Sequence, residues 1–136
     1  MGQLHLYAAS DRASRQIGYG VDGRTSLPLS GWDTDKAVIG DIEGDPISRD
    51  QCTGKIYYAL HGMGVWKFKE IAPSEAMLAK FLTFWRAYYH DIHDQDLFDD
   101  NDLISQASLD EISAALKNLG FKRMHIRAIL HMIYNG

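Results

Sequence analysis

Two histidines three residues apart, His90 and His93, have the spacing most suggestive of metal chemistry in this chain. Residues at i and i+3 lie on the same face of a helix, and two imidazoles placed in that way can share a zinc, copper, iron or nickel ion. A third ligand would have to come from elsewhere in the chain, and the candidates are His5, His61, His125 and His131. The dipole of a helix also favours histidine near its carboxyl end. The pair therefore supports the hypothesis of a metal-dependent enzyme without requiring it.

The segment that follows is strongly acidic. Between Ala87 and Leu116 there are eight carboxylates and no lysine or arginine. Their order does not match a calcium-binding EF-hand loop, which needs a glycine at position 6 and a glutamate at position 12. A patch of one charge sign speeds encounter with a partner of opposite charge, so this segment is a candidate contact surface for a basic partner. The alternative is a solvated loop. The carboxylates proposed for that surface are Asp94, Asp96, Asp99, Asp100 and Asp102.

The last part of the chain carries a basic pattern around Gly120. With Gly120 as the turn of a helix-turn-helix, the positions that must pack the two helices are all apolar, and the outward positions of the second helix are mostly basic. Leu116 departs from the pattern, because that position is usually small, and a plain αα-hairpin gives much the same spacing. The packing positions are Ala115, Leu119, Phe121, Ile126 and Ile129. The outward positions are Lys122, Arg123, Arg127 and His131, of which Lys122, Arg123 and Arg127 are the candidate nucleic-acid contacts.

Signatures of catalysis are weak. Cys52 could act as a nucleophile if a base such as His61 lay beside it, but a lone cysteine near a turn is more often an ordinary small residue. The sequence contains no nucleophile elbow, no phosphate loop and no dinucleotide fingerprint. We therefore expect no cofactor, and we favour binding over catalysis.

The first half of the chain is predicted to position these residues through β-structure. Alternation over 3–8 and the glycine-punctuated stretch containing 36–42 indicate short strands. Two further strands, 55–60 and 65–71, flank the sequence His-Gly-Met-Gly at 61–64, which is typical of a hairpin turn. These segments predict a small, mostly antiparallel sheet over residues 3–71.

The rest of the chain has the apolar spacing of helices. One amphipathic helix is predicted over 74–93 with Ser74 as its N-cap, and Met77, Phe84 and Tyr88 widen its apolar stripe. An αα-hairpin is predicted over 108–134, opening with a capping box at Ser-Leu-Asp-Glu, 108–111, and turning at Gly120. The fold class is therefore α+β.

Length and charge bound the remaining possibilities. At 136 residues the chain fits a single domain, 1–136. A net charge of −4 argues mildly against a dedicated nucleic-acid binder. One cysteine, no signal sequence and no apolar run of membrane-spanning length lead us to expect a soluble cytoplasmic protein with no membrane partner.

The preferred hypothesis is a small acidic protein-binding module: an adaptor, inhibitor or immunity-type protein without catalysis. The acidic segment and the wide apolar stripe of the 74–93 helix support it, and the stripe also allows a homodimer. The alternatives are a DNA-binding regulator that uses the C-terminal hairpin and a metal-dependent enzyme centred on His90 and His93.

Overall fold

A computed structural model describes residues 4–89 and 104–135. Five antiparallel strands pair in chain order, from β1 to β5, so the sheet is a simple meander. Their bounds are Leu4–Leu6 for β1, Lys36–Ile42 for β2, Asp45–Asp50 for β3, Ile56–Tyr58 for β4 and Lys69–Ala72 for β5. Among the described residues three α-helices follow, with α1 at Glu75–Ala87, α2 at Gln106–Asn118 and α3 at Arg123–Asn135. The predicted α+β class and the antiparallel sheet are confirmed.

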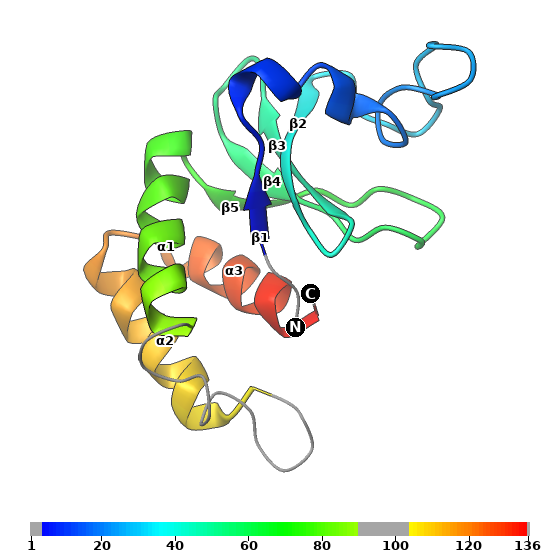
Figure 1. Ribbon diagram of the computed structural model, residues 1–136. Helices are drawn as coiled ribbons and strands as arrows, with labels where there is room; N and C mark the ends of the chain where they lie inside the picture. The colour runs from blue at the N-terminus through cyan, green and yellow to red at the C-terminus, as the bar shows by residue number, and fades with distance from the viewer. Residues whose placement is uncertain (1–3, 90–103, 136) are drawn as a thin grey trace.

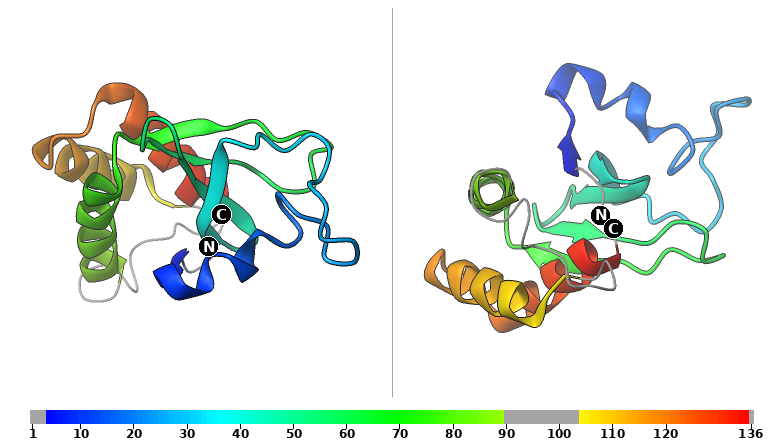
Figure 2. Two further views of the ribbon diagram at one scale, coloured as in Figure 1. Left: turned by 90° about the horizontal axis from the view of Figure 1, so that it is seen from above. Right: turned by 60° about the horizontal axis from the view of Figure 1, so that its bottom comes forward.

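The sheet lies between two unequal layers. The N-terminal segment, which contains two short 3-10 turns at Ala9–Asp11 and Ser14–Gln16, lies on one side, and α2 and α3 lie on the other (Figure 1 and the right-hand view of Figure 2). Helix α3 packs against β5, α2 packs against α3, and α1 also contacts β5. Gly40 allows β1 to approach, because a Cβ there would lie 2.3 Å from the carbonyl oxygen of His5. None of the described helices is long and apolar enough to cross a lipid bilayer.

The predicted hairpin of 55–60 and 65–71 is wrong in its second strand. Strands β4 and β5 do pair, but β5 begins only at Lys69, so the connection runs from 59 to 68 and extends beyond the sheet (Figure 1). Trp66 and Phe68 turn instead toward Trp32, with ring centroids 5.3 and 5.2 Å away. Aromatic packing takes the place of strand pairing in this segment. Gly62 and Gly64 adopt the positive φ angles expected of them.

Helix α1 begins as predicted, since the Ser74 hydroxyl accepts a hydrogen bond from the Met77 amide. The part of the predicted 74–93 helix beyond residue 89 lies outside the described residues. The apolar surplus expected on this helix is not exposed. Tyr88 is buried, and Met77 and Phe84 pack against the core. Within the described part of the chain, the wide stripe therefore serves the core and leaves no free apolar strip on α1.

The predicted capping box at 108–111 is also wrong. Helix α2 begins one turn earlier, because the Ser105 hydroxyl caps it by accepting from the Ser108 amide. Ser108 is buried inside the first turn, and Glu111 accepts a hydrogen bond from the Tyr88 hydroxyl at 2.9 Å instead of reaching back to a cap. The hydrogen bond from Tyr88, the C-cap residue of α1, therefore takes the place of the predicted capping-box contact of Glu111.

The turn between α2 and α3 is confirmed at Gly120. Its φ of +99° is the left-handed conformation that glycine adopts most easily. The Gly120 amide donates to the Lys117 carbonyl and the Phe121 amide donates to the Leu116 carbonyl, which together form a Schellman motif. Leu116, which departs from the helix-turn-helix pattern, is fully buried and belongs to the core.

Candidate binding surface

Two adjoining grooves lie between the 59–68 connection, β5 and α3. Their volumes are about 200 and 400 Å³, and both are lined by Lys69 and His131. We call this surface the Lys69 face. It comprises Tyr58, Leu60, Met63, Val65, Lys67, Lys69, Met124, Arg127 and His131.

The fold brings these residues together from distant parts of the chain. Strand β4 supplies Tyr58, and α3 supplies a stripe at i, i+3 and i+7, namely Met124, Arg127 and His131. Tyr57 and Tyr58 point to opposite sides of the sheet, as consecutive strand residues must. The Tyr57 ring lies near Lys36, while the Tyr58 hydroxyl hydrogen-bonds to Nδ1 of His131. This hydrogen bond ties the sheet to α3 at the floor of the grooves.

Electrostatics at the floor favour the neutral forms of both partners. Burial, followed by the nearby positive charge of Lys69, lowers the pKa of His131 below its ordinary value of 6.5. Burial, followed by the charge of Asp45, raises the pKa of Tyr58 to about 12. At neutral pH the Tyr58 hydroxyl therefore keeps its proton and shares a hydrogen bond with Nδ1 of the neutral His131 ring. The floor is polar but uncharged.

The rim of the Lys69 face is positively charged. Lys67, Lys69 and Arg127 are exposed, and none of them forms an ion pair with another described residue. The only carboxylate that lines the grooves is Glu70, among the residues described. It is engaged by the buried His125 and by Lys55, whose Nζ lies 3.5 Å from a Glu70 oxygen. An acidic protein thus presents a locally basic surface.

Apolar side chains are exposed on the same face. Six large hydrophobic residues are exposed in the described chain, and Met63, Val65 and Met124, between 53% and 65% exposed, line these two grooves. The others are Ile17, Leu27 and Tyr134. Single exposed hydrophobic residues need no explanation, but a cluster beside a groove is typical of an interaction site.

A third groove, of about 580 Å³, separates α2 from α3 and adjoins the Lys69 face through Arg127. Arg123 and Arg127, two of the predicted nucleic-acid contacts, line it, and Lys122 is exposed at the turn before α3. His131 was expected to point outward with them. That prediction is wrong, since His131 is half-buried against Tyr58. The cause is the packing of α3 on the sheet.

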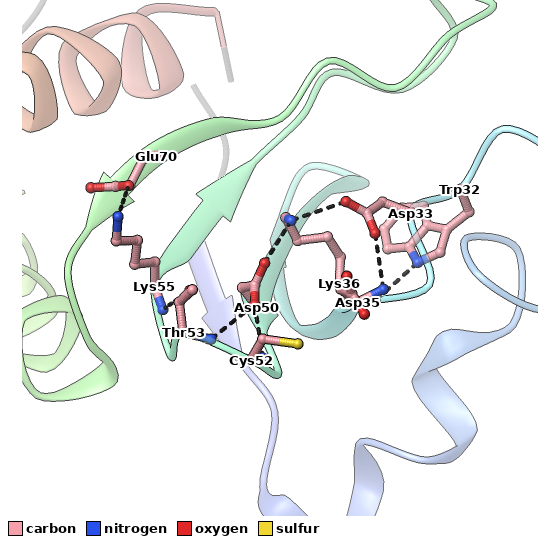
Figure 3. Close-up of polar contacts among 9 residues, drawn as sticks. All are labelled: Trp32, Asp33, Asp35, Lys36, Asp50, Cys52, Thr53, Lys55 and Glu70. Carbon is pink, nitrogen blue, oxygen red and sulfur yellow. Dashed lines mark hydrogen bonds and ion pairs between the residues drawn. The ribbon is translucent and has the colours of Figure 1, made fainter.

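A separate polar cluster surrounds Lys36 (Figure 3). The buried Nζ of Lys36 lies 2.9 Å from Asp50 and 3.1 Å from Asp33 and is 4.5 Å from the centre of the Tyr57 ring. Burial alone would lower the pKa of Lys36, but the hydrogen bonds to the two carboxylates outweigh it and raise that pKa. The indole nitrogen of Trp32 donates to the Lys36 carbonyl at 2.9 Å.

Asp50 completes this cluster. It accepts hydrogen bonds from Lys36 and from the backbone amides of Thr53 and Cys52, and these bonds lower the pKa of Asp50 to about 2 (Figure 3). All of these partners are internal, so the cluster holds the fold together. The exposed Cys52 and the suggested base His61 lie before and after β4, and His61 binds Asp45 instead. The structure does not bring them together as a catalytic pair.

The remaining sequence-predicted sites cannot be located. His90 and His93 lie outside the described residues, and so do Asp94, Asp96, Asp99, Asp100 and Asp102. Within 4–89 and 104–135, no group of three or more His, Cys, Asp or Glu side chains is arranged to hold a metal ion. Sequence reasoning missed the Lys69 face. The signal available was the alternation of Lys67 and Lys69 with Trp66 and Phe68, which places both lysines on one side of an extended segment.

The chain was compared with known protein families, with curated proteins and with solved structures, and none of the three comparisons found a match.

Proposed function

We propose that this protein is a protein-binding module, of the kind that adaptors, inhibitors and immunity-type proteins provide, and that it acts by binding without catalysis. The observation that carries the proposal is the Lys69 face, where exposed apolar side chains, and cations that form no ion pair with another described residue, line two adjoining grooves. Protein interfaces combine an apolar centre with a polar rim in this way. The acidic segment at 94–102 remains a second predicted contact surface.

Burial of the exposed apolar side chains would supply part of the free energy of a weak to moderate interface. Fully burying a Val or Met side chain contributes about 1.5–3 kcal/mol. Met63, Val65 and Met124 are each slightly more than half exposed, so burying all three against a partner would contribute roughly 3–5 kcal/mol. Micromolar affinity corresponds to about 8 kcal/mol, so polar contacts at the rim and further buried area must supply the rest.

The test is an affinity capture from lysate of the source cells, with nuclease treatment and quantitative mass spectrometry. The variant Met63→Asp plus Met124→Asp places two charges at the centre of the Lys69 face. Its matched control is Leu27→Asp plus Ile17→Asp, which changes two equally exposed hydrophobic residues away from the grooves. We expect a stoichiometric protein partner that survives nuclease, is retained by the control and is lost by the Lys69 variant. Equal capture by both variants, or no stoichiometric partner, would contradict the proposal.

A second candidate is a DNA-binding regulator that uses the α2–α3 hairpin. The observation in its favour is that Lys122, Arg123 and Arg127 are exposed and form no ion pair within the described residues. Each phosphate contact adds about 0.9 to the slope of log affinity against log salt. Duplex binding should therefore lose affinity and slope on Arg123→Ala plus Arg127→Ala, and a lack of binding at low salt would end this candidate.

The hypothesis of a metal-dependent enzyme centred on His90 and His93 stays a prediction. Its test is stoichiometric uptake of zinc or manganese by a metal-free preparation, with a His90→Ala plus His93→Ala variant as the comparison. The absence of uptake by the unmodified chain would rule it out.

A further inference from the structure

We infer that the Lys69 face accepts an acidic segment of a partner protein, with an apolar side chain of that segment inserted between the 59–68 connection and α3. The inference rests on the proposed function and deepens it, because it states the chemistry of the partner. Three features of the face carry it: the charge of its rim, the apolar character of its walls and the size of its grooves.

The charge of the rim selects an anionic partner. Lys67 and Lys69 lie on one side and Arg127 on the other, and none of them has a carboxylate partner among the described residues. Glu70 does not neutralise them, because His125 and Lys55 already engage it. Aspartate or glutamate side chains at the rim would gain charge-assisted hydrogen bonds, and the lysines would gain counter-charges that no other described residue supplies.

The walls and the size of the grooves select a polypeptide over a free small molecule. The groove of about 200 Å³ is walled by Met63, Val65 and Leu60 above the Tyr58–His131 pair. Small-molecule pockets usually measure roughly 300–1,000 Å³ and enclose their ligand. A groove of about 200 Å³ that adjoins one of about 400 Å³ suits a single apolar anchor on a chain that continues along the surface, as in peptide recognition.

The same walls argue against nucleic acid at this face. Methionine and valine side chains line the same grooves as the cations, and burying them against phosphates or sugars would gain little. A peptide that alternates acidic and apolar residues satisfies both sets of side chains together. A DNA duplex is therefore the competing outcome of the test.

The experiment uses the full chain and synthetic twelve-residue peptides. One peptide alternates glutamate with leucine and phenylalanine, and a second has lysine in place of every glutamate; a DNA duplex is the third probe. The readout is nuclear magnetic resonance of 13C-methyl-labelled methionine. Met63 and Met124 report on the Lys69 face, while Met132, which is buried, and Met77, which packs against the core, report on global change.

We expect the acidic peptide to shift the Met63 and Met124 methyl signals in a saturable way while Met77 and Met132 stay in place. Lys67→Glu plus Lys69→Glu should weaken binding at least tenfold. The matched control Lys80→Glu plus Arg86→Glu, on the exposed side of α1, makes the same change in net charge and should bind as the unmodified protein does.

Any of four results would overturn the inference. The first three are no binding of the acidic peptide at millimolar concentration, equal binding of the lysine peptide, and tighter binding of the duplex at the same methionines. The fourth is equal weakening by both charge variants, because the effect would then be one of net charge alone. The proposed function fails separately, in the capture experiment, where the apolar variants are compared. In one further result, a captured partner is lost with Met63→Asp plus Met124→Asp and still binds the Lys67→Glu plus Lys69→Glu variant. That result would support the protein-binding module and contradict the acidic ligand.

Discussion

Replacing the buried Lys36 by methionine tests whether its ion pair with Asp50 stabilises the pairing of β2 with β3 at the start of β2. The substitution preserves most of the apolar stem and removes the ammonium group, which leaves the Asp50 carboxylate, with a side chain only 12% exposed, without its counter-charge. Breaking a buried pair in this way typically costs about 3–5 kcal/mol. Asp50 keeps two backbone donors, from Cys52 and Thr53, so we expect a lower cost of about 2–4 kcal/mol. The exposed Asp33 adds about 1 kcal/mol at most.

The assay is equilibrium urea unfolding followed by tryptophan fluorescence and by circular dichroism. Trp32 and Trp66 lie 5.3 Å apart in the adjoining aromatic cluster, and the third tryptophan, Trp85, is buried in α1. Fluorescence therefore reports on this end of the sheet and on α1, while circular dichroism reports largely on the helices. The control is Lys67→Met, an exposed lysine that forms no ion pair with a described residue, and its effect should stay within about 0.5 kcal/mol.

A double variant separates the ion pair from packing. If the pair carries the effect, Lys36→Met plus Asp50→Asn should be less destabilising than the sum of the two single changes, because no uncompensated charge remains. The lowered pKa of Asp50 gives a second signature. Its contribution to stability is present above pH 4 or so and is lost as pH falls toward about 2, and this dependence should weaken in Lys36→Met. A loss below 0.5 kcal/mol or so for Lys36→Met, or strict additivity, would refute the reasoning.

Three further predictions concern the helices and the floor of the Lys69 face. Gly120→Ala should destabilise the protein by about 1–2 kcal/mol in urea unfolding, because φ of +99° is a strained conformation for alanine; an unchanged midpoint would contradict the Schellman turn. Ser105→Asp should be tolerated, since aspartate is a good N-cap, whereas Ser108→Asp should destabilise the protein by at least about 2 kcal/mol because it buries a charge. The reverse order in thermal unfolding would indicate that Ser108 is the N-cap. Titration of the His131 ring by nuclear magnetic resonance should give a pKa below 6.5 that rises in Lys69→Met. Since the unfolded state binds the proton more readily, the contribution of His131 to stability is present above pH 6.5 and is lost as pH falls below it, so a His131 pKa above 6.5 would disprove the burial argument.

Local patterns in the sequence were sufficient for the fold class and for several element boundaries. The Ser74 cap and the turn at Gly120 depend on interactions within a few residues, and the 36–42 strand has a strong local preference for extended backbone; the structure has all three where they were predicted. Apolar periodicity likewise located the helices, because a stripe at helical spacing must be buried whichever surface covers it. The stripe does not show which surface covers it. For this reason the broad apolar face of α1 suggested a partner protein, whereas in the structure it packs against the core.

The errors arose where tertiary contacts displaced a local preference. Trp66 and Phe68 alternate with lysines as in a strand, yet they pack around Trp32, and β5 starts only at Lys69. The serine and glutamate at 108–111 form a capping box in sequence, but Glu111 accepts from Tyr88 of the preceding segment. In each case the competing contact comes from residues distant in sequence, which no local window contains.

The sequence by itself determined the α+β class, the glycine turn and the basic character of α3, because these follow from backbone preferences and side-chain period. Only the tertiary structure decided that α3 lies beside the 59–68 connection, that His131 turns inward to Tyr58, and that Lys67, Lys69 and Arg127 share one surface with Met63 and Met124. The physical reason is that a binding surface depends on which faces the core leaves uncovered, and that is settled only when the sheet and the helices have packed.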